Sequence, residues 1–317
     1  MASQTEQENL HLGRQDFMSV VLRLTGMELY KFRRRMMSKV LSTISILAVV
    51  LVFLLIALFV ALLLNSTVPQ ESVRTISELL RLPRSLYVAV QIAFPLGQIL
   101  IVILVGVIVG GEYGVGTIRL MFTRGPSRTQ FLISKMGAAI TCIAIGVLSI
   151  TLLSIVLGQL LYLITGIAPD FSFFSAAWLG HAVLYLLIAM LSLFVYAMMA
   201  LFLATLGRSA AAGIAGTLVW IFLIETVLKA ICNTVALVTH GAAADFFRTV
   251  PDYFINANVT ALQQNQYQAL FGDAFAQPTQ SNGPTLSDLH ALLVLLGYLM
   301  LFIGLSWWVN ERRDVTN

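Results

Sequence analysis

The sequence GGEYGVGTIRLMFTRGPSRTQFLISK, residues 110–135, separates two long apolar runs at residues 88–109 and 136–164. It mixes one acidic and four basic residues with apolar side chains, and a Gly-Pro pair at residues 125 and 126 predicts a turn. Ser127 follows this turn and is a preferred residue for a helix N-cap, so a second helix is expected to start there. A simple connection between two apolar helices would need fewer polar residues.

The first part of this stretch, residues 112–122, has the length of a short helix with little stability of its own. Gly114 and Gly116 would each cost that helix about 0.5–1 kcal/mol relative to alanine. So short a helix is also marginal by itself in water. We therefore expect residues 112–122 to become helical against another surface, and we expect that surface to belong to another protein.

The composition of the whole chain indicates a membrane protein. Of its 317 residues, 58% are hydrophobic and only 11% are charged, whereas a soluble domain carries about a quarter charged residues. The apolar residues form continuous runs near or above the length of about 20 residues that spans a bilayer as a helix. Because these runs do not alternate apolar and polar residues, a transmembrane β-barrel is excluded. The predicted fold class is all-α and polytopic.

Six membrane spans are predicted, and residues 39–309 form the transmembrane domain. They are expected at residues 40–64, 85–109, 135–164, 176–206, 210–230 and 289–309. Residues 207–209, between the fourth and fifth spans, are expected to form a minimal turn on the inner side. Pro95 lies inside the second span and predicts a kink there, because proline removes one backbone hydrogen bond. The long polar segment 233–288 precedes the sixth span and is expected outside, with an amphipathic or re-entrant helix at 245–261 and a loop at 263–283.

The distribution of positive charge predicts the orientation in the membrane. Basic residues concentrate on the side that carries the N-terminus and residues 110–135, and short cytoplasmic loops carry such an excess. Both termini are therefore expected in the cytoplasm, with a disordered tail at residues 1–16 and a second tail at residues 310–317. The net charge of +4 is explained by this topology, so nucleic acid is not an expected partner.

An amphipathic helix is predicted at residues 17–38, before the first span. Its apolar residues follow helical spacing, and arginines and lysines follow them. Such a helix lies in the plane of the inner membrane face with its basic side chains toward anionic lipid head groups. Alternatively, the basic residues mark the inner end of the first span. The candidate functional residues of this helix are Arg23, Glu28, Lys31 and Arg34.

Few residues could carry chemistry inside the membrane. Glu225 and Lys229 are the ionisable residues well inside an apolar run, and their i,i+4 spacing suits a helix ion pair. Either they form that pair near the outer interface, or Glu225 faces a water-filled transport path, since a charge in the membrane is costly. Gln91 and Gln98 share a helix face and suit a solute pathway or interhelical hydrogen bonds. The candidate pathway residues are Gln91, Phe94, Gln98, Trp220 and Glu225.

Small residues predict close helix contacts. Gly106 and Gly110 form a small-xxx-small pair at the end of the second span, and residues 210–216 are mostly alanine and glycine. Close packing within the chain or across a dimer explains both. No Gly-Lys-Ser/Thr sequence of a P-loop and no His-Glu-x-x-His zinc motif occurs, and the four histidines are dispersed. We therefore expect neither an enzyme nor a metal site in this chain.

The stretch 110–135 resembles the first cytoplasmic loop of permeases of type-2 ATP-binding-cassette (ABC) transporters. In that family a Gly-Glu follows the second span, and a Gly-Thr, a basic residue, a turn and a returning helix come next. The matching residues here are Gly111, Glu112, Tyr113, Gly116, Thr117, residues 124–128 and Lys135. At Gly114 many relatives carry a basic residue instead. The order of in-plane helix, six spans and long outer segment also fits the family.

The resemblance implies that residues 112–122 are a coupling helix that docks on a separate ATPase subunit, beside the in-plane helix. ATP and Mg²⁺ would bind that subunit, and this chain would hold no cofactor. A second permease chain would complete a path between the second and fifth spans for export of a drug, peptide or lipid-like solute across a plasma membrane, expected to be bacterial. The residues implied in coupling are Glu112, Tyr113, Gly116, Thr117, Arg119, Arg124 and Arg128.

One alternative function stays open at this stage. An ion-coupled secondary transporter or channel could use Glu225 as its proton or ion site. It would need more charge inside the membrane than the sequence contains, and it would leave the stretch 110–135 without a role. An intramembrane enzyme would need His, Asp, Ser or Cys residues clustered at one depth, and no such cluster is found.

Overall fold

The computed structural model describes residues 17–64, 73, 76–80, 82–114, 127–163, 174–271 and 286–312. Within these residues, six helices are long and apolar enough to cross a membrane: Met36–Leu64, Arg84–Glu112, Arg128–Leu161, Ala176–Gly207, Ala210–Val238 and Asp288–Arg312. The prediction of an all-helical chain with six such segments is confirmed. The architecture indicates a multi-pass membrane protein.

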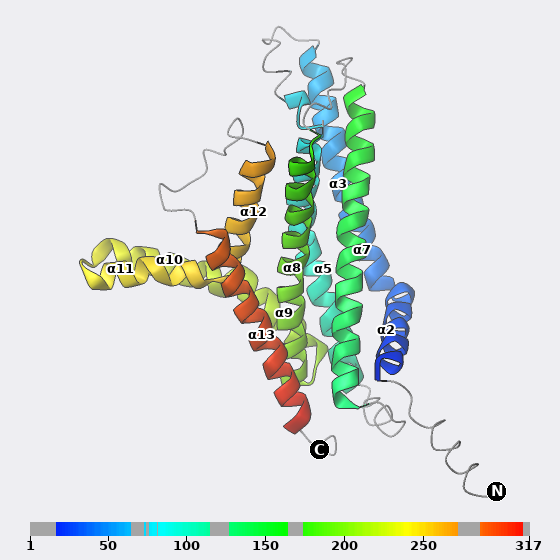
Figure 1. The fold of residues 1–317 in the computed structure, drawn as a ribbon, viewed down its shortest axis with the longest axis vertical. Coiled ribbons are helices and arrows are strands. Elements are labelled where there is room, and N and C mark those ends of the chain that lie inside the picture. Colours follow the sequence, from blue (N-terminus) through cyan, green and yellow to red (C-terminus); the bar gives the residue numbers. More distant parts are fainter. Residues whose placement is uncertain are drawn as a thin grey trace, which may run out of the picture.

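The helices form an elongated bundle (Figure 1). In chain order they are α2 (Phe17–Arg34), α3 (Met36–Leu64), α5 (Arg84–Gly114), α7 (Arg128–Leu163), α8 (Ala176–Gly207), α9 (Ala210–Val219), η1 (Trp220–Ile224), α10 (Glu225–Val238), α11 (Ala242–Thr249), η2 (Val250–Tyr253), α12 (Ile255–Phe271) and α13 (Asp288–Arg312). The start of α7 and the C-terminal end of α13 lie at the same end of the bundle as α2 (Figure 1). We call this end the base.

Helix α8 is the centre of the bundle. It packs against α5, α7, α9, α12 and α13, and its side chains Tyr196, Met198 and Leu201 are fully buried. The Ser175 side chain caps its N-terminus by accepting a hydrogen bond from the Trp178 backbone N–H. At the other end Arg208 adopts the left-handed conformation, with φ 49°, and reverses the chain into α9. The predicted tight turn at residues 207–209 is confirmed.

Helices α5 and α9 approach each other closely through glycine. A Cβ atom on Gly110 would lie 2.1 Å from the backbone nitrogen of Ala210, and one on Gly106 would lie 2.7 Å from Cγ1 of Ile214. The obstacle at Gly110 is backbone, so glycine is required there, whereas a Cβ at Gly106 would force the Ile214 side chain to shift. The expected role of the small residues is confirmed, and the contact lies within one chain.

Several predicted boundaries differ from the structure. Helix α2 ends at Arg34 and α3 starts at Met36, so residues 36–38 belong to the first span helix. Helix α5 continues to Gly114, which makes Gly110, Gly111 and Glu112 the end of a long helix and not the start of a loop. Two consecutive glycines have low helix propensity, but Gly110 packs directly on the backbone of α9 and the helix continues past both of them. Helix α13 runs to Arg312, beyond the expected end at residue 309.

The fifth span is not a single straight helix. Helix α9 passes through the π-helical segment η1 into α10, and Figure 1 shows α10 and α11 projecting sideways from the bundle. A π-helical segment inserts an extra residue per turn and shifts the side chains that follow it. The next residues are largely helical as far as Phe271, so the prediction of a loop from residue 263 is wrong for residues 263–271.

Candidate functional site

A cluster of four charged side chains joins three helices at the base of the bundle. The Lys135 Nζ on α7 lies 2.8 Å from Glu28 Oε1 on α2 and 2.8 Å from Glu112 Oε1 on α5. The Lys31 Nζ on α2 lies 2.9 Å from the same Glu28 oxygen and 2.8 Å from the same Glu112 oxygen. We call Glu28, Lys31, Glu112 and Lys135 the charge cluster.

Burial makes this cluster a strong constraint on structure. The side chains of Lys135, Glu28 and Glu112 are only 2%, 3% and 9% exposed, whereas Lys31 is 41% exposed at the rim. Charges removed from water are tolerated only when they are paired, and breaking a buried pair on one side costs about 3–5 kcal/mol. Lys135 also lies 4.8 Å from the centre of the Phe131 ring, a cation–π distance.

The pKa values of the α2 residues reflect these contacts. Burial alone would raise the pKa of Glu28, but the attraction of Lys135 and Lys31 and the hydrogen bond from Lys31 hold it below its ordinary value. Burial likewise opposes the charge on Lys31, yet the hydrogen bonds and charges of Glu112 and Glu28 raise its pKa above the ordinary value. Both groups are therefore charged at neutral pH, and each stabilises the other's ionised form.

The sequence of α2 explains why Glu28 points inward. Its buried residues Val20, Val21, Leu24, Glu28 and Phe32 recur at helical spacing on one face. Helix α2 packs along α7 on this face, and the Thr25 hydroxyl is within hydrogen-bond distance, 3.4 Å, of the Ser134 carbonyl of α7. Glu28 therefore replaces an apolar residue on an otherwise apolar face, where only pairing with lysine makes it acceptable.

The start of α7 is fixed by a reciprocal cap and by α13. The Gln130 backbone N–H donates to the Ser127 hydroxyl at 3.1 Å, and the Ser127 backbone N–H donates to the Gln130 side chain at 2.8 Å. This arrangement is a capping box and confirms the N-cap predicted at Ser127. Arg128 then donates to the backbone carbonyls of Asn310 and Glu311. The chain therefore re-enters the bundle at a well-defined point.

The residues implied in coupling divide into two groups. Glu112 lies in the charge cluster and Arg128 holds α13, so both anchor the two sides of the connection between α5 and α7. Tyr113 is the penultimate residue of α5. Residues 112–114, the start of the helix predicted at 112–122, therefore belong to the end of α5. The remaining part of that predicted helix lies outside the described residues, as do Gly116, Thr117, Arg119 and Arg124.

The surface cations predicted on the first helix lie on its exposed side. Arg34 donates from Nε to the Tyr30 hydroxyl at 3.0 Å and also lies over the Tyr30 ring. Arg23 is exposed, as expected for a residue facing lipid head groups or solvent. Glu28 and Lys31, the other two candidates on this helix, instead contact α7 and α5. Lys135 was expected as a basic residue of the stretch that matches the permease family, without an assigned partner. A single acidic residue on an apolar face was the signal for its role.

Of the five pathway candidates, Phe94 alone belongs to the lining of a cavity of about 910 Å³ beside α3 and α7, in the described part of the chain. Gln98 is buried near the Tyr196 hydroxyl, and Gln91 is exposed. Gln91 and Gln98 share one face of α5, but one is exposed and the other is buried, so their surroundings differ.

Glu225 has a structural role in the described residues. Its Oε1 accepts hydrogen bonds from Trp220 Nε1 and from the Ile255 backbone N–H, each at 3.0 Å. Its Oε2 accepts one from the Asn256 backbone N–H at 3.0 Å. The carboxylate therefore caps the N-terminus of α12, where the helix dipole favours negative charge. The expected pair with Lys229 does not form, because Lys229 is exposed and Glu225 faces α12.

Comparison with known protein families adds a family but no activity. Residues 78–316 match a family described as proteins of unknown function, DUF2705. The match covers most of the chain, so the chain belongs to this family. A search of the curated proteins found no match. Among the described residues, no group of three or more His, Cys, Asp or Glu side chains could hold a metal ion.

Proposed function

We propose that this chain is the membrane subunit of an ABC exporter of type 2, powered by a separate ATPase. The observation that carries the proposal is the charge cluster. It locks α2, the end of α5 and the start of α7 together around the two ends of the connection at residues 115–126. A connection whose two ends are fixed by buried ion pairs can receive a push from a partner and transmit it.

Helices α5 and α7, on either side of residues 115–126, would carry that displacement into the bundle. Both helices that leave the connection, α5 and α7, run through the bundle, and α5 packs on the central helix α8. Buried, paired charges resist separation, so a displacement at the base would move α2, α5 and α7 as one body. ATP-dependent closure of two partner subunits would then tilt these helices and change access to the path.

The solute path would form between two copies of this chain or with a sister chain. Within one chain, α5 and α9 are in backbone contact at Gly110, which leaves no room for a solute at that point. The solute class that suits an apolar bundle with few buried charges is an amphipathic or hydrophobic molecule, such as a drug, a peptide or a lipid. ATP and Mg²⁺ would bind the partner ATPase, since this chain lacks a P-loop. The plasma membrane, with both termini in the cytoplasm, is the proposed location.

Co-purification tests the proposal. The tagged chain, extracted from its own membranes in mild detergent, should bring down an ATPase that has a P-loop. Arg119→Glu and Arg124→Glu should release that ATPase, because both arginines lie in the proposed docking loop. Arg248→Glu is the matched control, since Arg248 is an exposed arginine on α11, away from the base. If the wild-type chain recovers no ATPase, or if all three variants retain it equally, the proposal is wrong.

A further inference from the structure

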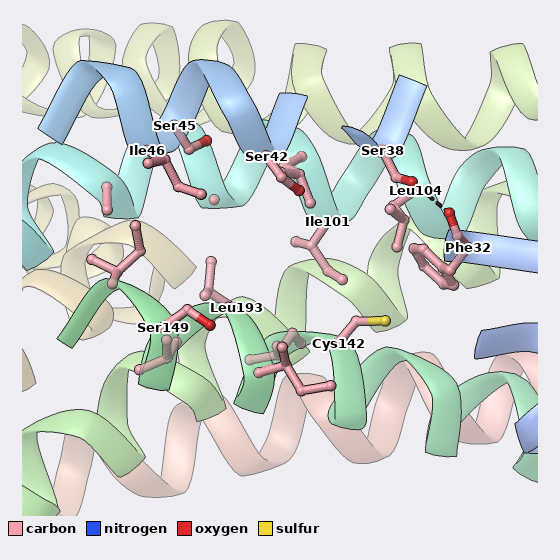
Figure 2. Close-up of a pocket in the computed structure, with 18 of the residues that line it drawn as sticks. Phe32, Ser38, Ser42, Ser45, Ile46, Ile101, Leu104, Cys142, Ser149 and Leu193 are labelled. Atoms are coloured by element: carbon pink, nitrogen blue, oxygen red, sulfur yellow. Dashed lines mark hydrogen bonds between the residues drawn. The ribbon is translucent and has the colours of Figure 1, made fainter. Parts of the chain in front are cut away.

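A long cavity of about 910 Å³ runs beside the junction of α2 and α3. Its walls come from α2, α3, α5 and α7, with two residues of α8. In Figure 2, Ser42 and Ser45 on α3 lie opposite Cys142 and Ser149 on α7. The cavity has the size of a site for a molecule rather than of a packing defect, since ligand pockets measure about 300–1,000 Å³.

The walls are apolar along most of their length. Ile101, Leu104, Ile143 and Leu193 are buried residues of the bundle core that face the cavity. The Ser38 hydroxyl is satisfied by the Phe32 carbonyl at 2.6 Å (Figure 2), and the Ser45 hydroxyl by the Leu41 carbonyl at 3.0 Å. Because these walls are apolar and the groove opens on the lipid-facing surface of the bundle, a hydrocarbon chain is the natural occupant.

Cations gather at one end of the cavity. Arg33 and Lys39 belong to its lining, and both are exposed at the junction of α2 and α3. Neither forms an ion pair within the described residues. Arg35 lies between them in the chain, and its buried Nη1 has no hydrogen-bond partner among those residues. Two cations of the lining, Arg33 and Lys39, therefore border the end of the cavity nearest the base, and no described carboxylate forms an ion pair with either of them.

The depth of the cavity matches one leaflet of a bilayer. Its lining on α5 extends from Leu104 to Val90, which at 1.5 Å per residue is about 21 Å. Half of a bilayer, including its head-group region, is about 20–22 Å thick. One side is accessible to lipid, because Ile46 on α3 and Gly146 on α7 line the cavity and are also exposed on the bundle surface.

We propose that this groove binds one anionic phospholipid from the leaflet at the base of the bundle. Its phosphate would pair with Arg33 and Lys39, and an acyl chain would lie along Ile101, Ile143 and Leu193. The hydroxyls of Ser42 and Thr43, just inside the cationic end, form no hydrogen bond within the described residues and can donate to the ester oxygens. The inference goes beyond the proposed transport function and needs no ATPase partner.

The test is photocrosslinking of the purified chain in nanodiscs, with phosphatidylglycerol or phosphatidylcholine that carries a photoactivatable acyl chain. With phosphatidylglycerol, crosslinks should map to the cavity-lining segments of α3, α5 and α7. The variants Arg33→Gln and Lys39→Gln should each weaken this labelling roughly fivefold, since each cation near a membrane surface contributes about that factor toward anionic lipid. Arg34→Gln is the matched control, because Arg34 is the neighbouring cation outside the lining.

A second variant blocks the acyl chain instead of the phosphate. Nothing lies within 4 Å of a Cβ built on Gly146, so Gly146→Leu would fill the groove without a clash. It should abolish groove labelling by both lipids, whereas Gly297→Leu on α13, which is equally uncrowded, should not change it. The proposal is overturned if labelling is spread evenly over all lipid-facing helices. The proposal is also overturned if groove labelling is the same in Arg33→Gln, Lys39→Gln and Gly146→Leu as in the wild-type chain. Equal labelling of the groove by phosphatidylcholine and phosphatidylglycerol would overturn it too.

Discussion

Lys135 is the residue on which the base of the bundle depends most. It is the most buried member of the charge cluster, and it contacts one carboxylate on α2 and one on α5. Replacing it by methionine keeps most of the volume and removes the charge. Glu28 and Glu112 would then share only Lys31, which is partly exposed, so their mutual repulsion would be poorly compensated.

We expect Lys135→Met to destabilise the chain by about 3–5 kcal/mol. Thermal unfolding in detergent, followed by intrinsic fluorescence, measures the loss. Lys39→Met is the control, because Lys39 is an exposed lysine without an ion pair in the described residues and its loss should change stability little. Equal shifts for the two variants would show that the cluster does not stabilise the base.

Glu28 gives the base a pH dependence of known sign. Its pKa in the folded chain is held below the ordinary value of 4.5, so the unfolded chain binds a proton first as the pH falls. The stability contributed by Glu28 is therefore complete above the ordinary pKa and is lost as the pH falls through the lowered one. Glu28→Gln should reduce the loss of unfolding temperature below pH 4.5. A curve as steep as that of the wild-type chain would contradict the assigned pKa shift.

At the scale of helices, α5 offers a matched pair of adjacent glycines. A Cβ on Gly110 would collide with the backbone of Ala210, whereas one on Gly111 would meet nothing within 4 Å. We expect Gly110→Ala to destabilise the α5–α9 contact by about 1–3 kcal/mol. Gly111→Ala should stabilise the helix by about 0.5–1 kcal/mol. Chemical unfolding of both variants measures the difference, and shifts of the same sign would refute the observed packing.

The N-terminus of α12 depends on Glu225 in a similar way. Removing the carboxylate by Glu225→Ala would leave the N–H groups of Ile255 and Asn256 without their acceptor. Hydrogen exchange at the first turn of α12 should then become faster, and Lys229→Ala should not affect it. If exchange stays unchanged while a proton-driven flux disappears, Glu225 is an ion site and the secondary-transporter hypothesis gains support.

At this scale, the sequence predicted the features that depend on neighbouring residues and missed those that depend on contacts between distant segments. Apolar runs, the Ser127 cap and the tight turn at residues 207–209 depend on neighbours in the chain, and all three were found. The continuation of α5 through Gly110 and Gly111 depends on a contact with α9, distant in sequence. The sideways direction of α10 depends on η1, and the charge cluster depends on three helices meeting. For each of these three features, the residues nearby in the sequence were not sufficient to predict the structure.

For the whole molecule, orientation in the membrane decides whether an ATPase can reach the base. The start of α7 and the end of α13 lie together there, because Arg128 holds the backbone of Asn310 and Glu311. Helix α12 lies toward the other end of the bundle (Figure 1). The distribution of basic residues predicts that the base faces the cytoplasm, and α12 should therefore lie outside.

Single cysteines test this orientation in intact cells. In a chain lacking its two free cysteines, Cys142 and Cys232, Arg23→Cys places a thiol on the exposed side of α2 and Gln264→Cys places one on the exposed side of α12. A membrane-impermeant maleimide should label position 264 in whole cells and position 23 only after the cells are opened. The reverse result would put the base outside, beyond the reach of any cytoplasmic ATPase. The proposed transport function would then fail, while the lipid groove would remain, in the opposite leaflet.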